Sequence, residues 1–114
     1  MRRPSQQAAF SKKEISHLFK TARRTLQQAG LNILLAPKTK EFGRILVVTA
    51  AKIGTSPERN RIRRRLKAIF YEKKLFENSY DCVVIVKKEG VDLGHQELTQ
   101  LLLQAFEQIK TKSA

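Results

Sequence analysis

The chain has 114 residues, of which 41% are hydrophobic, so it can form one domain, residues 1–114, around a single core without disulfides or metal. Its 23 lysines and arginines outnumber its 10 acidic residues and leave a net charge of +13. Such a charge favours a polyanionic partner, nucleic acid first. A highly soluble protein without such a partner is the remaining alternative.

Other classes of protein fit this sequence less well. There is no apolar run of about 18 residues and no signal-peptide core after Met1, so we expect neither a membrane span nor secretion. Binding to an anionic membrane surface is disfavoured, because no basic helix has a broad exposed apolar face. The lone Cys82 cannot form an internal disulfide, and we expect a cytoplasmic protein.

The first predicted element is a helix that begins after Ser11, where Ile15, Leu18 and Phe19 recur three and four residues apart. Periodicity alone would let this helix continue to a stop at Gly30. The preceding residues 1–9 are polar, and we expect them to be flexible until a partner orders them.

Two strands and a second helix follow. Residues 31–36 form a short apolar run before a proline, and residues 44–51 are apolar and β-branched, as in a strand. Ser56 and Pro57 then supply a helix cap and a first-turn proline, which predicts a helix to about Lys74.

The last two predicted elements are a strand over residues 80–88 and an amphipathic C-terminal helix that contains Leu98, Leu102 and Phe106. The strand–helix–strand unit of residues 44–86 suggests two parallel strands joined by the second helix.

The second helix concentrates the positive charge. Five arginines and one lysine occupy the nine positions Arg59–Lys67, with no acidic residue among them. A solvated helix surface is the ordinary explanation of a charge run, but such surfaces usually mix both signs to gain i,i+4 pairs. Arginine also grips phosphate at two points. The pattern therefore favours phosphate binding.

Helical geometry divides this segment into a packed face and charged flanks. The packed face is predicted to hold Ile62, Leu66, Ile69, Phe70 and Lys73. The polar and charged side chains around it are Arg59, Asn60, Arg61, Arg63, Arg64, Arg65, Lys67 and Lys74.

The segment "KIGTSPERNRIRRRLKAIF" resembles the signature of the bacterial ribonuclease P protein subunit, whose Arg-Asn-Arg core matches Arg59, Asn60 and Arg61. The helix around Phe19, the strand "YDCVVIVKK", the size and the order of elements also match, so the resemblance covers nearly the whole chain. Following the family, we place the end of the first helix near Thr21, with "RRTLQQ" as a short edge strand.

Several positions depart from the family pattern. Ile15 and Leu34 stand where the family often has aromatic residues, so base stacking should depend mainly on Phe19. "TAAK" replaces a Ser-Lys-Lys run and keeps only Lys52. Arg65 stands where an apolar residue is usual, and we expect it to contribute less to binding than its neighbours.

The resemblance implies an α+β fold: a two-layer sandwich of order αβββαβα, with a four-stranded, mostly antiparallel sheet and a left-handed βαβ crossover. It also implies an accessory subunit of an endoribonuclease whose RNA is the catalyst, which removes the 5′ leader of precursor tRNA. The partners would be the catalytic RNA and precursor tRNA, with no membrane and no small-molecule substrate. Mg²⁺ would be bound mainly by the RNA.

The resemblance assigns two groups of site residues and no protein catalytic or metal-ligating residue. The residues implied to bind the catalytic RNA are Lys52, Arg59, Asn60, Arg61, Arg63, Arg64 and Lys67. The residues implied to line a leader cleft are Lys12, Ile15, Phe19 and Lys20. A plain core role for Phe19 is the alternative, given its helical spacing with Ile15 and Leu18.

Two alternatives to this function remain open. A protein-based nuclease is disfavoured, because His17 and His95 are far apart in the sequence, have no cysteine or carboxylate at metal-ligand spacing, and are each interpreted as surface or helix-end residues. Cys82 in an apolar strand is predicted to be a core residue, and no carboxylate pair for two metal ions is evident. Asp81 and Asp92 are interpreted as strand-end and helix-cap residues. A ribosomal or other structural RNA-binding protein would share the charge and the arginine-rich helix.

Overall fold

A computed structural model describes residues 10–28 and 30–113 of the chain, with side chains described except at positions 24, 25, 28 and 109–113. The predicted flexibility of residues 1–9 lies outside this part. The helices are α1 (Lys12–Thr21), α2 (Ser56–Glu72) and α3 (His95–Ser113). The strands are β1 (Arg23–Gln28), β2 (Leu31–Pro37), β3 (Ile45–Thr49) and β4 (Tyr80–Val86). The predicted order αβββαβα is confirmed.

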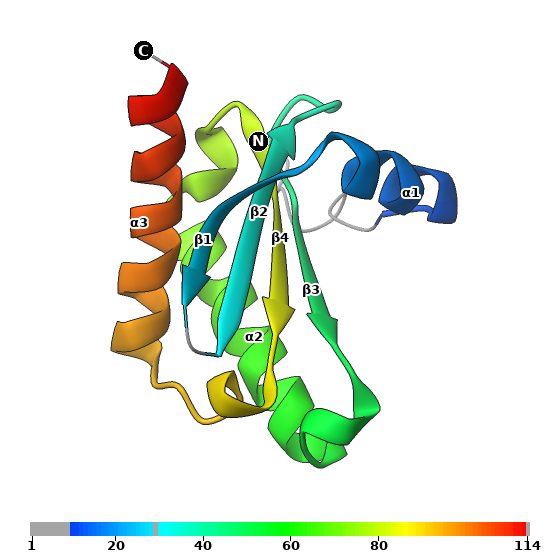
Figure 1. The fold of residues 1–114 in the computed structure, drawn as a ribbon, viewed down its shortest axis with the longest axis vertical. Coiled ribbons are helices and arrows are strands. Elements are labelled where there is room, and N and C mark those ends of the chain that lie inside the picture. The colour runs from blue at the N-terminus through cyan, green and yellow to red at the C-terminus, as the bar shows by residue number, and fades with distance from the viewer. Residues whose placement is uncertain (1–9, 29, 114) are drawn as a thin grey trace.

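The four strands form one mixed sheet in the order β1-β2-β4-β3. β1 pairs with β2 and β2 with β4 in antiparallel fashion, whereas β3 and β4 are parallel. In Figure 1, β3 and β4 both run downward, β4 lies to the left of β3, and α2 lies behind them. The β3–α2–β4 connection is therefore left-handed, against the usual right-handed rule.

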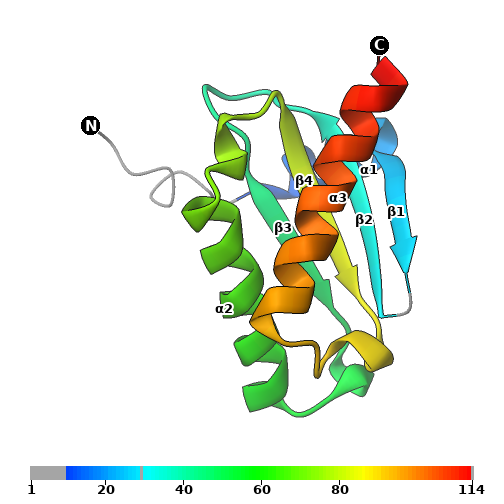
Figure 2. The same cartoon turned by 90° about the vertical axis from the view of Figure 1, so that its left-hand side faces the viewer.

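The two faces of the sheet are covered unequally. Helices α2 and α3 cover one face, and α1 lies across part of the other face, as Figures 1 and 2 show together. Alternate residues of β2, β3 and β4 enter the main core with α2 and α3. The opposite face, called here the open face, carries a smaller cluster of Leu18, Ala36 and Val83.

Helix α1 ends where the family pattern placed its end, and not at Gly30. Ser11 caps its start in a capping box with Glu14, and Ala22 adopts an extended conformation at its C-cap. The chain then continues as β1, paired with β2. Pairing along this hairpin stabilises the strand where local periodicity would have allowed more helix.

The start and end of α2 correct two details of the sequence prediction. Its N-cap is Thr55 and not Ser56, because the Thr55 hydroxyl accepts from the Glu58 backbone and the Glu58 carboxylate accepts from the Thr55 backbone. The helix ends at Glu72, and Lys74 has a left-handed conformation with φ 54°. Lys73 is consequently exposed and does not belong to the packed face.

The apolar phase of α2 agrees with the prediction. Ile62, Leu66, Ile69 and Phe70 are completely buried against the sheet and α3. Because these four residues face the core, the remaining side chains of α2 point outward, so packing of the apolar face fixes the direction of the arginines.

Among the described residues, no helix is both long and apolar enough to span a bilayer.

Candidate RNA interface

One flank of α2 gathers four of the predicted RNA-binding residues around a shallow concavity of about 510 Å³. Asn60, Arg63, Arg64 and Lys67 line it together with Ser56 and Pro57. The Asn60 carboxamide accepts from Arg63 Nη1 at 3.3 Å, and Arg63 Nη2 also bonds to the Thr49 hydroxyl at the end of β3. These contacts orient Arg63, while Arg64 and Lys67 are exposed to solvent. The concavity therefore presents three cations to an anionic partner.

The other predicted residues of α2, Arg59 and Arg61, do not line this concavity. Arg59 is half-buried and donates to the Ser56 hydroxyl at 3.0 Å. Arg61 projects from the opposite flank, where Nη2 lies 3.7 Å from an Asp92 carboxylate oxygen in an exposed pair. Such an exposed pair contributes little stability, so Arg61 can exchange it for a phosphate.

Lys52 belongs to a second concavity, of about 500 Å³, where it lies with Lys87, Lys88 and one carboxylate, Glu89. Lys87 and Lys88 were not among the site residues predicted from the sequence. A signal was present: Lys52 follows β3 and the two lysines follow β4, and the carboxyl ends of parallel neighbours lie at one edge of a sheet.

Helix α1 presents Phe19 to solvent. The Phe19 side chain is 45% exposed, so a plain core role for it is wrong. Leu18 is the residue that packs on the open face, with 3% exposure. At about 100° per residue, Ile15 and Phe19 lie together on one flank of α1, beside Leu18.

The open face beside this flank is mainly apolar and only half-covered. Strand register places five side chains here: Leu34, Leu46, Val48, Ile85 and Asn32. The buried Oδ1 atom of Asn32 has no hydrogen-bond partner among the described residues. An exposed ring, an apolar floor and a polar amide together are suited to unstacked bases.

The two lysines predicted for the leader cleft lie on the outer surface of α1. Lys12 and Lys20 line a hollow of about 330 Å³ with Lys13, Ser16 and His17. From the sequence His17 was predicted to be a surface or helix-end residue, and Lys13 was not among the predicted site residues. Their helical spacing with Lys20 was the available signal, since positions four and three residues apart share a face.

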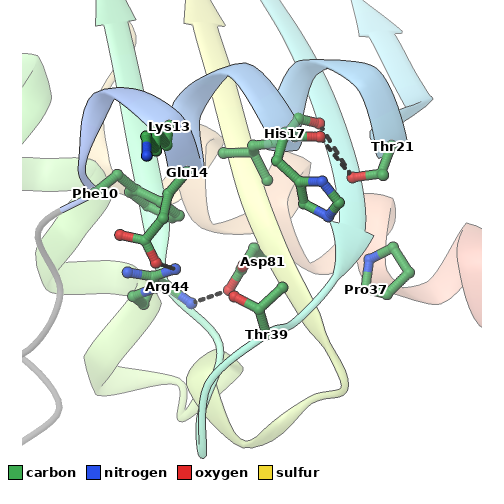
Figure 3. A pocket seen from close by; sticks show the side chains of 10 residues that line it. Phe10, Lys13, Glu14, His17, Thr21, Pro37, Thr39, Arg44 and Asp81 are labelled. Carbon is green, nitrogen blue, oxygen red and sulfur yellow. Dashed lines mark hydrogen bonds and ion pairs between the residues drawn. The ribbon is translucent and has the colours of Figure 1, made fainter.

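The other flank of α1, away from Phe19, borders a pocket of about 260 Å³ (Figure 3). At its base Arg44 is 2% exposed and donates from Nη2 to Glu14 Oε2 at 2.8 Å. The centroid of the Phe10 ring lies 4.0 Å from the Arg44 guanidinium carbon. The Arg44 backbone N–H donates to Asp81 Oδ1 at 2.8 Å. The pocket thus contains a buried arginine held from three sides.

The pKa values of both carboxyl groups in this cluster are shifted, in opposite directions. The hydrogen bond from Arg44, followed by that from the Ser11 backbone, lowers the pKa of Glu14 to about 2. Burial raises the pKa of Asp81, against the opposing effect of the Arg44 backbone bond. Glu14 is therefore ionised at neutral pH and pairs with Arg44.

The described residues offer little to protein-based metal or thiol chemistry. They include no group of three His, Cys, Asp or Glu side chains placed to hold a metal ion. Cys82 is completely buried in β4, and burial raises the pKa of its thiol. A buried, protonated thiol is a core residue and a poor nucleophile.

Comparison with solved structures identifies the same fold in two proteins of named function. The ribonuclease P protein of Staphylococcus aureus superposes with a TM-score of 0.72 at 15% identity, covering 87% of this chain and 91% of that one. The ribonuclease P protein of Thermotoga maritima, in complex with 1-(4-fluorophenyl)-2-thiourea, gives 0.69 at 23% identity, with 81% and 90% covered.

Sequence comparison is more specific than the fold. The family model described as Ribonuclease P matches residues 4–110. The ribonuclease P protein component of Petrotoga mobilis is 31% identical over 87 residues, which cover 70% of this chain and 74% of that protein. Taken with the shared fold and the arginine-rich helix, these matches mean that the chain belongs to the ribonuclease P protein family, the protein component of an endoribonuclease ribonucleoprotein.

Proposed function

We propose that this protein binds the catalytic RNA of ribonuclease P through α2 and holds the 5′ leader of precursor tRNA beside α1. It would act in the cytoplasm and assist the endonucleolytic removal of that leader, which gives the mature 5′ end. The RNA carries the chemistry in this proposal. The observation that supports it best is the exposed Phe19 ring beside the half-covered apolar floor of the open face.

The catalytic RNA would contact basic side chains on both flanks of α2 and Lys52 in the segment before it. The residues assigned to this contact are Lys52, Arg59, Asn60, Arg61, Arg63, Arg64 and Lys67. Guanidinium forks bind phosphate oxygens at two points, and most of these side chains lie off the packed face, where they can reach a polyanion. We add Lys87 and Lys88, because they share the concavity of Lys52.

The leader would lie along the Phe19 flank of α1. Bases would stack on Phe19 and contact Ile15 and the floor, and Lys12 and Lys20 would attract the backbone from the outer surface of α1. The Asn32 amide offers donors and an acceptor to a base edge on an otherwise apolar floor.

Mg²⁺ would serve the reaction by stabilising charge on the reacting phosphate. The described residues of this chain do not form a carboxylate cluster suited to hold it. We therefore propose that the RNA holds the metal, and that the protein contributes binding and orientation of the RNA strands.

Phe19→Leu tests the leader contact, because leucine keeps most of the bulk and removes the aromatic ring. The experiment measures the affinity of the reconstituted holoenzyme for precursor tRNA and for mature tRNA, beside a melting curve of the free protein. Stacking contributes about 1–3 kcal/mol per base, so the preference for precursor should fall by about fivefold or more at nearly unchanged stability.

Leu103→Ala provides a control for the loss of an exposed apolar side chain. Leu103 is 40% exposed on α3, on the opposite side of the sheet from α1, and its truncation should leave both affinities unchanged. A Phe19→Leu protein that keeps the full preference for precursor would exclude stacking of the leader on Phe19.

A further inference from the structure

Helix α1 has a small apolar attachment to the sheet. Of its ten residues only Leu18 is buried, in the cluster with Ala36 and Val83. This cluster is separate from the main core that holds α2 and α3. A single buried leucine sets the height of the helix above the sheet but opposes rolling about the helix axis only weakly.

The Glu14–Arg44 pair supplies the second attachment. Arg44 precedes β3, its backbone N–H donates to Asp81 of β4, and its carbonyl accepts from the Cys82 N–H at 2.8 Å. The backbone N–H and carbonyl of Arg44 are thus both bonded to β4. Its side chain reaches up to Glu14 Oε2 at 2.8 Å and lies against the Phe10 ring (Figure 3).

The pair lies on the opposite side of the helix from Phe19. At about 100° per residue, Glu14 lies roughly 40° to one side of Leu18 and Phe19 about 100° to the other. A roll of α1 about Leu18 that separates Glu14 from Arg44 therefore also changes the height of the Phe19 ring over the open face. The Glu14–Arg44 distance and the position of the Phe19 ring are therefore coupled through the rotation of α1.

We propose that Arg44 is a positioning residue for leader binding: through Glu14 it fixes the rotation of α1 and so holds Phe19 at the open face. This inference rests on the proposed function of the Phe19 flank. Because α2 is anchored in a different cluster, Arg44 controls leader affinity and leaves the affinity of the protein for catalytic RNA unaffected.

Glu14→Gln removes the ion pair with Arg44 but keeps the helix cap. Glutamine can still accept from the Ser11 backbone, since Ser-x-x-Gln also forms a capping box, but it carries no charge toward Arg44. The experiment measures the affinities of the reconstituted holoenzyme for precursor and mature tRNA, and the affinity of the free protein for catalytic RNA. The protein set is wild type, Glu14→Gln, Arg44→Gln, the double variant and Arg44→Lys.

The preference for precursor over mature tRNA should fall about fivefold in Glu14→Gln, if α1 is correctly docked about one-fifth of the time. Arg44→Gln and the double variant should show the same loss as Glu14→Gln, because all three remove one shared interaction. Arg44→Lys should retain most of the preference, since it keeps the charge. Affinity for catalytic RNA should be unchanged throughout.

Ser11→Ala is the matched control, because it removes the cap and keeps the ion pair. It should lower helix stability and retain most of the preference for precursor. An unchanged preference in Glu14→Gln, or an equal loss of all three affinities, overturns the positioning role. If Arg44→Gln does not fold, the result for Glu14→Gln alone decides whether Arg44 has the positioning role. A wild-type holoenzyme that does not prefer precursor would instead contradict the proposed function itself.

Discussion

The Arg65 guanidinium donates a hydrogen bond to the backbone carbonyl of Leu93 at 3.1 Å, which ties α2 to the segment before α3. Its neighbour Arg64 is exposed and lines the concavity on the other side of the helix. Two adjacent arginines therefore differ in role: one is committed to the fold, and the other is available to a partner.

Arg64→Gln and Arg65→Gln should consequently affect different properties: the first RNA binding, and the second stability. Arg64→Gln should weaken binding to catalytic RNA and lower the slope of log affinity against log salt by about 1, at unchanged stability. Arg65→Gln should lower stability by about 1 kcal/mol with little change in the salt slope. Salt titrations and urea unfolding of both variants check this, and equal salt slopes in the two would refute it.

Ile62→Ala should destabilise the protein by roughly 2–5 kcal/mol, because Ile62 is completely buried between α2 and the sheet. Lys67→Ala, on the exposed flank of the same helix, should leave the free energy of unfolding within about 0.5 kcal/mol of wild type. Urea unfolding gives both values. A similar loss in the two proteins would mean that the helix is packed in a different rotation.

Gly90→Ala should be strongly destabilising, because a Cβ at this position would lie 2.1 Å from the Gly30 carbonyl oxygen. Gly30 cannot readily move away: it has φ +99° and its carbonyl accepts from the Lys87 N–H. Gly94→Ala is the control, since its nearest neighbour would be Glu97 Oε1 at 3.9 Å. Thermal melting should show a large decrease for Gly90→Ala and little change for Gly94→Ala.

The Glu14–Arg44 pair should give the stability of the protein a characteristic pH dependence. A carboxylate with a lowered pKa in the folded chain stabilises the fold above its unfolded pKa, and that contribution is lost as pH falls toward the folded value. For Glu14 this window runs from its ordinary value of 4.5 down to about 2. The advantage of wild type over Glu14→Gln should therefore be full above pH 5 and disappear near pH 2.

Melting temperatures of the two proteins across this range provide the measurement. Asp81 titrates in both proteins, so the comparison removes most of its opposing contribution. A difference between the proteins that persists unchanged to pH 2 would mean that the charge of Glu14 does not stabilise the fold.

The sequence predicted the structure best where helical periodicity alone determined which residues are buried. The burial of Ile62, Leu66, Ile69 and Phe70 follows from helical spacing alone, and the direction of the arginines follows from that burial. The residue at which α1 ends could not be predicted from the local sequence, because the pairing of β1 with β2 determines it. The family resemblance supplied that end and the unusual crossover.

Arg44 illustrates what local patterns could not provide. In a chain of charge +13 an arginine before a strand is expected at the surface, yet Arg44 is 2% exposed. Its burial depends on Glu14, thirty positions earlier, and on Asp81 across the parallel pair. Asp81 is the second residue of β4, in agreement with its interpretation as a strand-end residue, and its side chain is 2% exposed. The pairing of β3 with β4 and the packing of α1 on the sheet bring these three residues together.

Cleavage of precursor tRNA at low Mg²⁺ shows whether this protein is an accessory to a catalytic RNA. The reaction is followed with the protein alone, with a bacterial ribonuclease P RNA alone, and with both. We expect no cleavage by the protein alone and a large gain in leader removal when protein is added to the RNA. Cleavage by the protein alone, or no gain over the RNA alone, would contradict this accessory role.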